Sequence, residues 1–578
     1  MIRPLLLALT LFCLSLSPLA AQENYPVPED SKPKDGVPNG ELHGPFTFDN
    51  SRIFPGTTRQ YGVYVPAQYT AKKPACLIVV QDGIGKARQW KLPTILDNLI
   101  HKGEVPVQIA VFVSPGVVPA ADGKRQTRFN RSFEYDGMGD RYARFLIEEF
   151  LPEVQKKWNI SQNPNDRAIA GSSSGAICAF TAAWERPDSF RRVISTVGTY
   201  VGLRGGHESS TMVRKYEPKP IRIFMQDGSN DLNIYGGDWW MANQAMYRSL
   251  KWAGYEVANI WGEGGHNGKH AAAIMPDAVR YIWHRYPEPV KAGMAEPAQR
   301  RSKILIPGED WQEVSSGHRF TEGPAVNSKG EVFFTDIPNS RIHKVGLDGK
   351  VGVVAEKTAN ANGLMFGPDG KLYACKNGEK KIVRYDENGK EETVLEGSPS
   401  NDLVILADGS GYYTDPGNKK LWHFTTDGRK KLVDEGIEFP NGVITSMDQA
   451  FLTVSDTRGR FTFSYRIQED GSLTDKQRYG HLHVPDVTAQ SGADGMAVDV
   501  EGRTYVTTKV GLQVLDQPGR VHIILRKPSN GWLSNVVFGG PQLDTLYVTC
   551  GDKVFKRKVN TKGVNPWQAP PKQPRPRL

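Results

Sequence analysis

One serine lies in a setting that would make it a nucleophile. Ser173 is the central residue of the segment 171–175, Gly-Ser-Ser-Ser-Gly, which fits the pattern Gly-x-Ser-x-Gly. The apolar residues before and after it predict a short strand at 168–170 and a helix at 176–184. In a strand–turn–helix setting, the two glycines allow close approach of strand and helix and leave the serine hydroxyl exposed. A chain this rich in glycine also produces the pattern by chance, so the motif needs partners.

A nucleophilic serine needs a base, and the base needs a carboxylate that fixes its tautomer. Asp231 follows the strand-like segment 221–225, and His266 follows the strand-like segment 257–261. Both residues are therefore expected in loops at carboxyl ends of strands, with the acid before the histidine. We predict that they form a triad with Ser173.

Other residues compete for these two roles. His270 is an alternative base, and His207 is less suitable because it precedes the acid. Asp227 is a weaker candidate for the acid, because it stands at the end of the preceding strand, where it would cap the turn.

A second group of polar residues lies in the C-terminal half. Glu322, Asn401, Asn441 and Asp494 offer carboxylate and amide oxygens, which suit a hard divalent cation. Asn362 either lines the same site or only turns the chain. Asn-Gly and Asp-Gly pairs are common in turns, so several of these residues have a purely structural alternative. Glu322 is the exception, because Glu-Gly-Pro is not a favoured turn sequence.

The elements around the serine define the first domain. Apolar strand-like runs alternate with helical periodicity at 139–157 and 239–253. This alternation predicts a mostly parallel sheet with helices on both faces over residues 40–287. Together with the turn at Ser173 and the order of acid before histidine, it is typical of the α/β-hydrolase fold. A polar linker is predicted at 288–304.

Repeats define the second domain. One phrase, a short aromatic or β-branched strand next to a turn, recurs six times at roughly 40–50-residue intervals, the period of a four-stranded propeller blade. We therefore predict an all-β six-bladed propeller over 305–562, followed by a disordered, basic, proline-rich tail at 563–578. The six phrases lie at 331–336, 371–374, 411–415, 451–456, 503–507 and 545–549.

Length and charge agree with this division. A chain of 578 residues is too long for one hydrophobic core. The net charge of +9 comes from scattered lysines and arginines without a basic cluster, which argues against nucleic-acid binding. The cysteines after the N-terminal segment are isolated in apolar runs, with neither metal-binding spacing nor a dense disulfide framework.

The N-terminal residues have the composition of an export signal. Arg3 precedes an almost unbroken apolar run at 5–16, and Ala20 and Ala21 offer a cleavage site. We predict a signal peptide at 1–21 and export to the periplasm or the medium. No later segment is apolar enough for stable membrane insertion.

The first domain resembles the esterase family of enterochelin-esterase-like and feruloyl-esterase-like enzymes. The resemblance implies ester hydrolysis through an acyl-enzyme on Ser173, completed by Asp231 and His266, without a cofactor. It also implies an oxyanion hole made by the backbone amides of Ser174 and Gly83. The matching motifs are 81–83, 130–136, 171–175, 228–231 and 264–266.

The second domain resembles the senescence-marker/gluconolactonase family of regucalcin-like lactonases. The resemblance implies that Glu322, Asn441 and Asp494 bind a divalent cation and that Asn401 contacts metal-bound water or substrate. Calcium is the expected ion, with zinc and magnesium as alternatives. Pro399 replaces an arginine found in some members, so their sugar-acid specificity is not transferred.

Together these features predict an exported serine carboxylesterase acting on carbohydrate-linked esters of acetyl or feruloyl type. Its partner is a small-molecule or polysaccharide ester, and its propeller would be a metal-dependent lactonase. The alternative is an esterase whose propeller is a non-catalytic module binding glycan or calcium. The sequence does not determine the oligomeric state.

Overall fold

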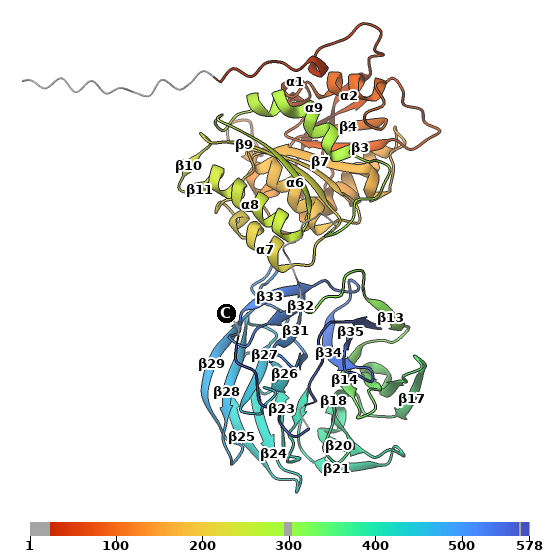
Figure 1. Ribbon diagram of the computed structural model, residues 1–578, viewed down its shortest axis with the longest axis vertical. Coiled ribbons are helices and arrows are strands. Elements are labelled where there is room, and N and C mark those ends of the chain that lie inside the picture. Colours follow the sequence, from red (N-terminus) through yellow and green to blue (C-terminus); the bar gives the residue numbers. More distant parts are fainter. Residues whose placement is uncertain (1–22, 294–302, 566–567, 577–578) are drawn as a thin grey trace, which may run out of the picture.

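The computed structural model describes residues 23–293, 303–565 and 568–576. An α/β domain and a six-bladed propeller lie one above the other in Figure 1. The predicted signal peptide and the centre of the predicted linker fall outside the described residues. None of the described helices is long and apolar enough to cross a membrane.

An eight-stranded sheet forms the centre of the first domain, in the order β1-β2-β4-β3-β7-β8-β9-β12. The strands from β4 to β12 pair in parallel, and β1 and β2 add an antiparallel edge. Every residue of β3 and β4 is buried, as expected for strands covered on both faces. The strands are β1 Glu41–Phe48, β2 Arg59–Val65, β3 Cys76–Gln81, β4 Gln108–Val113, β7 Arg167–Ser172, β8 Arg192–Thr196, β9 Arg222–Gly228 and β12 Glu256–Gly262.

Helices cover both faces of this sheet (Figure 1), as the alternating pattern predicted. Side chains of α2 and α9 enter the core on one face, and those of α6 and α8 enter the core on the other. The helix predicted at 139–157 contains a π-helical turn at Phe145–Phe150 between α4 and α5. The helices are α1 Gly85–Gln89, α2 Leu92–His101, α3 Arg131–Tyr135, α4 Arg141–Arg144, α5 Leu151–Gln155, α6 Ser174–Glu185, α7 Ser209–Lys215, α8 Trp239–Ala253 and α9 Lys269–Trp283.

Six four-stranded antiparallel sheets form the propeller, and each of the six repeated phrases is the second strand of one blade. The sixth blade takes its outer strand β13 from the start of the domain and its other strands from the end, which closes the ring. The strands are β13 Gln312–Ser315, β14 Thr321–Val326, β15 Val332–Asp336, β16 Arg341–Val345, β17 Val351–Glu356, β18 Ala361–Phe366, β19 Leu372–Lys376, β20 Lys381–Tyr385, β21 Glu391–Leu395, β22 Leu403–Ile405, β23 Gly411–Asp415, β24 Lys420–Phe424, β25 Lys430–Glu435, β26 Pro440–Thr445, β27 Phe451–Asp456, β28 Phe461–Ile467, β29 Leu473–His481, β30 Met496–Val498, β31 Thr504–Thr508, β32 Gly511–Leu515, β33 Val521–Leu525, β34 Leu533–Gly539, β35 Thr545–Cys550 and β36 Lys553–Lys558.

The start of the predicted tail belongs to the propeller. The amide of Gly563 donates to the Leu543 carbonyl at 2.8 Å, and that of Val564 donates to the Val498 carbonyl at 3.1 Å. The prediction that the tail begins at 563 is corrected accordingly, because these backbone groups are paired with two blades.

The two domains touch through the end of α7 and the strand β33. Tyr216 forms a parallel bridge with Ile524. The neighbouring carboxylate of Glu217 lies 2.7 Å from Arg557 and accepts a hydrogen bond from the Arg526 amide at 2.7 Å. A buried ion pair therefore lies in the interface.

Candidate active site and propeller channel

The turn between β7 and α6 holds Ser173 in a strained conformation. Its φ is +58° and its ψ is −125°, outside the regions that side-chain-bearing residues normally occupy. A Cβ atom on Gly171 would lie 2.2 Å from the Gly175 carbonyl oxygen, so strand and helix meet this closely only because residue 171 is glycine. The turn lifts the Ser173 hydroxyl out at the carboxyl end of β7.

Three side chains that are far apart in the sequence form one hydrogen-bonded chain. Ser173 Oγ lies 2.8 Å from His266 Nε2, and His266 Nδ1 lies 2.6 Å from Asp231 Oδ1. The Asp231 side chain is fully buried, and the imidazole is one-fifth exposed. This arrangement lets the imidazole accept the serine proton while the carboxylate stabilises the resulting positive charge.

Neighbouring groups fix the imidazole further. Trp239 packs edge-on against His266, with ring centroids 5.8 Å apart. Glu23 accepts hydrogen bonds from the amide of Gly265 at 2.7 Å and from Asn267 at 2.8 Å, on both sides of the histidine. No sequence pattern points to Glu23, because its contact joins opposite ends of the domain.

Asp227 contacts the acid of the triad rather than the histidine. Burial and the hydrogen-bonded Asp231 carboxylate raise the pKa of Asp227 to about 9. Burial alone would raise the pKa of Asp231, but hydrogen bonds from His266 and Asp227 bring it below its ordinary value. Apart from this mutual contact, the Oδ2 atoms of both residues are buried without a hydrogen-bond partner. A proton on Asp227, which its raised pKa favours, would let this residue donate to Asp231.

The competing histidine has a structural position. His270 Nδ1 lies 3.0 Å from Gln226 Nε2, and its ring stacks on Tyr25 with a centroid separation of 4.5 Å. Burial lowers its pKa. His270 therefore packs the N-terminal segment against α9.

The predicted oxyanion hole needs one correction. Ser174 provides the first amide of α6, which has no carbonyl partner within the helix and is free to bind an anion. The amide of Gly83, in contrast, donates to the Val113 carbonyl at 3.0 Å. An amide already engaged in this way does not point at an oxyanion, so Gly83 is not a donor in this conformation.

An ion pair stabilises the loop after β3, which contains Asp82 and Gly83. Arg131, at the start of α3, binds the Asp82 carboxylate through two nitrogens at 2.6 and 3.0 Å. It also donates to the Ser172 carbonyl at 3.3 Å, one residue before Ser173. The start of α3 and the loop after β3 are thereby held against the serine turn.

In the propeller, polar residues occur at or just before the start of the innermost strand of every blade. Hydroxyl groups on the second strands hold their backbones in place: Thr335 donates to the Asn362 carbonyl, Thr414 to that of Asn441 and Ser455 to that of Asp494, at 3.1, 2.6 and 2.8 Å. The first, third and fourth blades thus each position the channel residue of the next blade. The six positions are Glu322, Asn362, Asn401-Asp402, Asn441, Asp494 and Asn535.

The predicted ligands have partners that the sequence analysis missed. Asn535 donates to Glu322 at 3.0 Å, and Trp532 donates to Asp494 at 2.8 Å. Asn441 donates to Thr457 at 3.0 Å. Asn535 stands in a conspicuous segment, Ser-Asn-Val-Val, but an isolated asparagine carries no signal of its own.

In the third blade the residue after Asn401, Asp402, contributes a carboxyl group to the channel. Burial and the Glu322 charge raise the pKa of Asp402 to about 8. Burial raises the pKa of Glu322 to about 7, and burial together with the Glu322 charge raises that of Asp494 well above its ordinary range. Two buried carboxyl groups, Glu322 and Asp494, and the partly buried Asp402 repel one another, and such oxygen-rich sites are stabilised by a divalent cation. The residues therefore fit such an ion.

The fold and these two sites define a two-domain protein that joins a serine-hydrolase-type α/β domain to a propeller with an acidic channel. Residues 53–278 match the Esterase family, and residues 320–552 match the family described as SMP-30/Gluconolactonase/LRE-like region. These matches support a hydrolase acting on ester bonds in the first domain and a gluconolactonase-like propeller in the second.

Three individual proteins are each similar to part of the chain. The uncharacterized protein YbbA of Bacillus subtilis is 23% identical over 181 residues, covering 30% of this chain and 69% of its own. An iron(III) enterobactin esterase of Dickeya dadantii is 22% identical over 227 residues, 37% of this chain. The chain spans about half the length of that esterase, 48%. Pentonolactonase XacC of Haloferax volcanii is 25% identical over 250 residues, 41% of this chain and 83% of its own.

Solved structures resemble each half of the chain. A gluconolactonase from Xanthomonas campestris is 24% identical, with a TM-score of 0.40, and the match covers 44% of this chain and 90% of that one. A ferulic acid esterase is 17% identical, with a TM-score of 0.35, and the match covers 43% of this chain and 98% of that one.

Proposed function

We propose that the protein is an exported serine carboxylesterase acting through Ser173, with His266 as general base and Asp231 as the acid that orients it. The hydrogen-bonded chain from Ser173 Oγ to Asp231 carries this proposal. In acylation, Ser173 Oγ attacks the ester carbonyl while its proton passes to His266 Nε2, and the Ser174 amide faces the developing negative charge. The same nitrogen then protonates the leaving alcohol, and water completes the cycle.

Carbohydrate-linked esters of acetyl or feruloyl type are the proposed substrates. Exposed apolar side chains follow the acid of the triad in the sequence: Tyr235 is 94% exposed, four residues after Asp231, and Met241 is 64% exposed at the start of α8. An aromatic side chain such as that of Tyr235 can stack on a sugar or a feruloyl ring. Export rests on the predicted signal peptide.

Replacing the nucleophile tests the ester assignment. Ser173→Ala should lower aryl-ester turnover by a factor on the order of 10⁴ or more, because the base then has no hydroxyl to activate. Steady-state kinetics on acetyl and feruloyl esters measure this loss. Turnover equal to that of the wild type would remove the proposal.

We further propose that the channel is a metal-dependent lactonase site. A divalent cation held by Glu322, Asn441 and Asp494, with calcium as the first candidate, would polarise the lactone carbonyl and lower the pKa of a bound water. Trp532 fixes one Asp494 oxygen and Asn535 fixes Glu322, so both carboxylates are held in place. The burial of Glu322, Asn441 and Asp494 supports this role, as does the Glu322 charge, which raises the pKa of Asp402 and of Asp494.

Chelation separates the two activities. Removing divalent cations from the full chain, or introducing Asp494→Asn, should abolish hydrolysis of sugar lactones and spare hydrolysis of aryl esters. Lactone and ester assays on the same preparation measure both effects. If the untreated protein opens no lactone with any divalent cation, the propeller is a binding module instead.

A further inference from the structure

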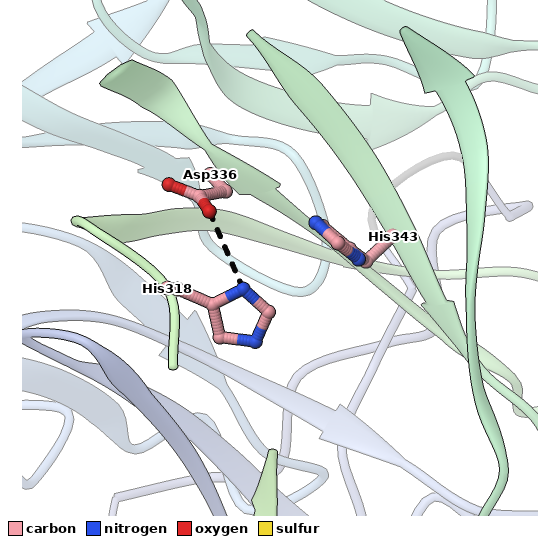
Figure 2. A group of neighbouring side chains, drawn as sticks. All are labelled: His318, Asp336 and His343. Carbon is pink, nitrogen blue, oxygen red and sulfur yellow. Dashed lines mark ion pairs between the residues drawn. The ribbon is translucent and has the colours of Figure 1, made fainter. Parts of the chain in front are cut away.

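Two histidines and an aspartate gather on the first blade, on elements other than those that carry the channel carboxylates (Figure 2). His318 lies in the loop before β14, Asp336 ends β15, and His343 lies on β16. Their potential ligand atoms all lie within 4.8 Å of one another. Among residues 23–293, 303–565 and 568–576, no other group of three or more histidine, cysteine or acidic side chains is so arranged.

The contact between His318 and Asp336 has the geometry of two ligands of one metal ion. Nδ1 of His318 lies 3.4 Å from Oδ2 of Asp336. That separation is too long for a charge-assisted hydrogen bond, which spans about 2.7–2.9 Å. Two ligand atoms bound tetrahedrally to zinc, each at about 2.0–2.1 Å, lie about 3.4 Å apart.

Both of these groups are oriented by further hydrogen bonds. His318 Nε2 lies 2.7 Å from Ser315 Oγ, and an Nε2–H donor in this bond leaves the Nδ1 lone pair facing Asp336. Asn339 donates to Asp336 Oδ2 at 2.7 Å, and the amide of Arg319 donates to Oδ1 at 3.2 Å. Outer hydrogen bonds of this type are what hold metal ligands in place.

His343 supplies the third group, and one of its ring nitrogens lacks a hydrogen-bond partner. The residue is 8% exposed, and its Nε2 is buried with no hydrogen-bond partner. Its ring stacks on Phe334 and lies 4.8 Å from the His318 ring, centroid to centroid. A buried polar nitrogen without a partner is costly, and a bound cation removes that cost.

A comparison with the third blade shows which part of the His318, Asp336 and His343 group is a structural feature that another blade repeats. Asp415 ends β23 as Asp336 ends β15, and Asn418 donates to Asp415 at 2.8 Å just as Asn339 donates to Asp336. The Asp-x-x-Asn turn is thus a repeated structural element. The pair of imidazoles facing the carboxylate is the addition in the first blade.

We infer that His318, Asp336 and His343 bind a divalent transition-metal ion of the zinc type, separate from the channel ion. Two imidazoles and one carboxylate are a ligand set that zinc favours, and they leave a fourth position for water. Binding draws His343 inward, because two ligand atoms of one zinc ion lie no more than about 4.2 Å apart. The site is independent of the ester chemistry.

Cobalt titration of the full-length, chelator-treated protein tests this site, since Co²⁺ reports tetrahedral coordination by intense visible absorption bands. The wild type should develop these bands with one equivalent of Co²⁺ and lose them when Zn²⁺ is added. His318→Gln and His343→Gln should weaken binding more than about 100-fold, beyond the loss expected for an outer hydrogen bond. Aryl-ester hydrolysis should be unchanged in both variants.

Two matched variants show whether the cobalt signal belongs to this cluster. His423→Gln removes another buried strand histidine, and Asp494→Asn removes a channel carboxylate; both should keep the wild-type cobalt spectrum. If the glutamine variants fail to fold, Ser315→Ala, which removes only the outer hydrogen bond, should still weaken binding roughly 10–100-fold. A wild type without tetrahedral bands, or folded glutamine variants that bind cobalt as the wild type does, would overturn the inference.

Discussion

At the scale of single residues, two adjacent carboxyl groups take opposite charge states. Asp231 is ionised because His266 and Asp227 donate to it, whereas Asp227 keeps its proton because burial and its charged neighbour disfavour ionisation. The proton on Asp227 thus binds one oxygen of Asp231 while His266 binds the other. Asp227 is a positioning residue, because it acts on the serine only through Asp231.

This pair predicts that ester hydrolysis weakens at alkaline pH. Below about pH 9 Asp227 is protonated and donates to Asp231; above it, two buried negative charges repel each other, so kcat/KM for an ester should fall. Asp227→Asn keeps a donor that does not titrate, so turnover at neutral pH should persist and the alkaline fall should disappear. Asp227→Leu should lower kcat at all pH values. Identical pH–rate profiles for wild type and Asp227→Asn would contradict the shared proton.

At the scale of elements, the serine turn depends on how closely β7 and α6 approach. The parallel strands bring Ser173, Asp231 and His266 to one edge because they follow β7, β9 and β12. In the propeller, the hydroxyls of the second strands play the corresponding role, since each fixes a carbonyl of the next blade. In both domains, then, the regular elements place the reactive groups.

Gly171→Ala tests the serine turn. The added methyl group would lie 2.2 Å from the Gly175 carbonyl oxygen, so the turn must shift. We expect ester turnover to fall about 100-fold, as a displacement of about 1 Å would cause, with lower thermal stability. Gly85→Ala is the control, because a methyl group there meets nothing within 4 Å. Kinetics and thermal melts compare the two, and an active Gly171→Ala enzyme would disprove the tight packing.

At the scale of the whole molecule, a buried charge pair lies in the interface that joins the two domains. The Glu217 and Arg557 side chains are 10% and 5% exposed. Removing one partner of a buried pair leaves the other charge uncompensated. We therefore expect the interface to couple the unfolding of the two domains through Glu217.

Glu217→Ala should uncouple them. We expect a loss of about 3 kcal/mol of interface stability and a separation of the thermal transitions of the two domains. Differential scanning calorimetry measures this separation. Glu438→Ala, which removes an exposed ion pair with Lys419, should leave the thermogram unchanged. A wild-type thermogram for Glu217→Ala would show that the domains unfold independently of this contact.

The sequence by itself determined the two architectures and the choice of Ser173, Asp231 and His266 as neighbours. Local patterns carried them: the glycines around Ser173, the alternation of strands and helices, and one strand phrase repeated in six blades. These signals are local because backbone conformation at a turn and the period of burial are set by neighbouring residues.

Contacts between distant segments were decided only by the tertiary structure. Three contacts join residues whose types alone do not predict them: Asp227 with Asp231, Glu23 with the loop of His266, and Asn535 with Glu322. The amide of Gly83 was misassigned because its acceptor, Val113, lies on another strand. The His318, Asp336 and His343 group has no sequence spacing typical of a metal site. Burial, shared protons and ligand geometry depend on which atoms the fold brings together, and no local pattern encodes that.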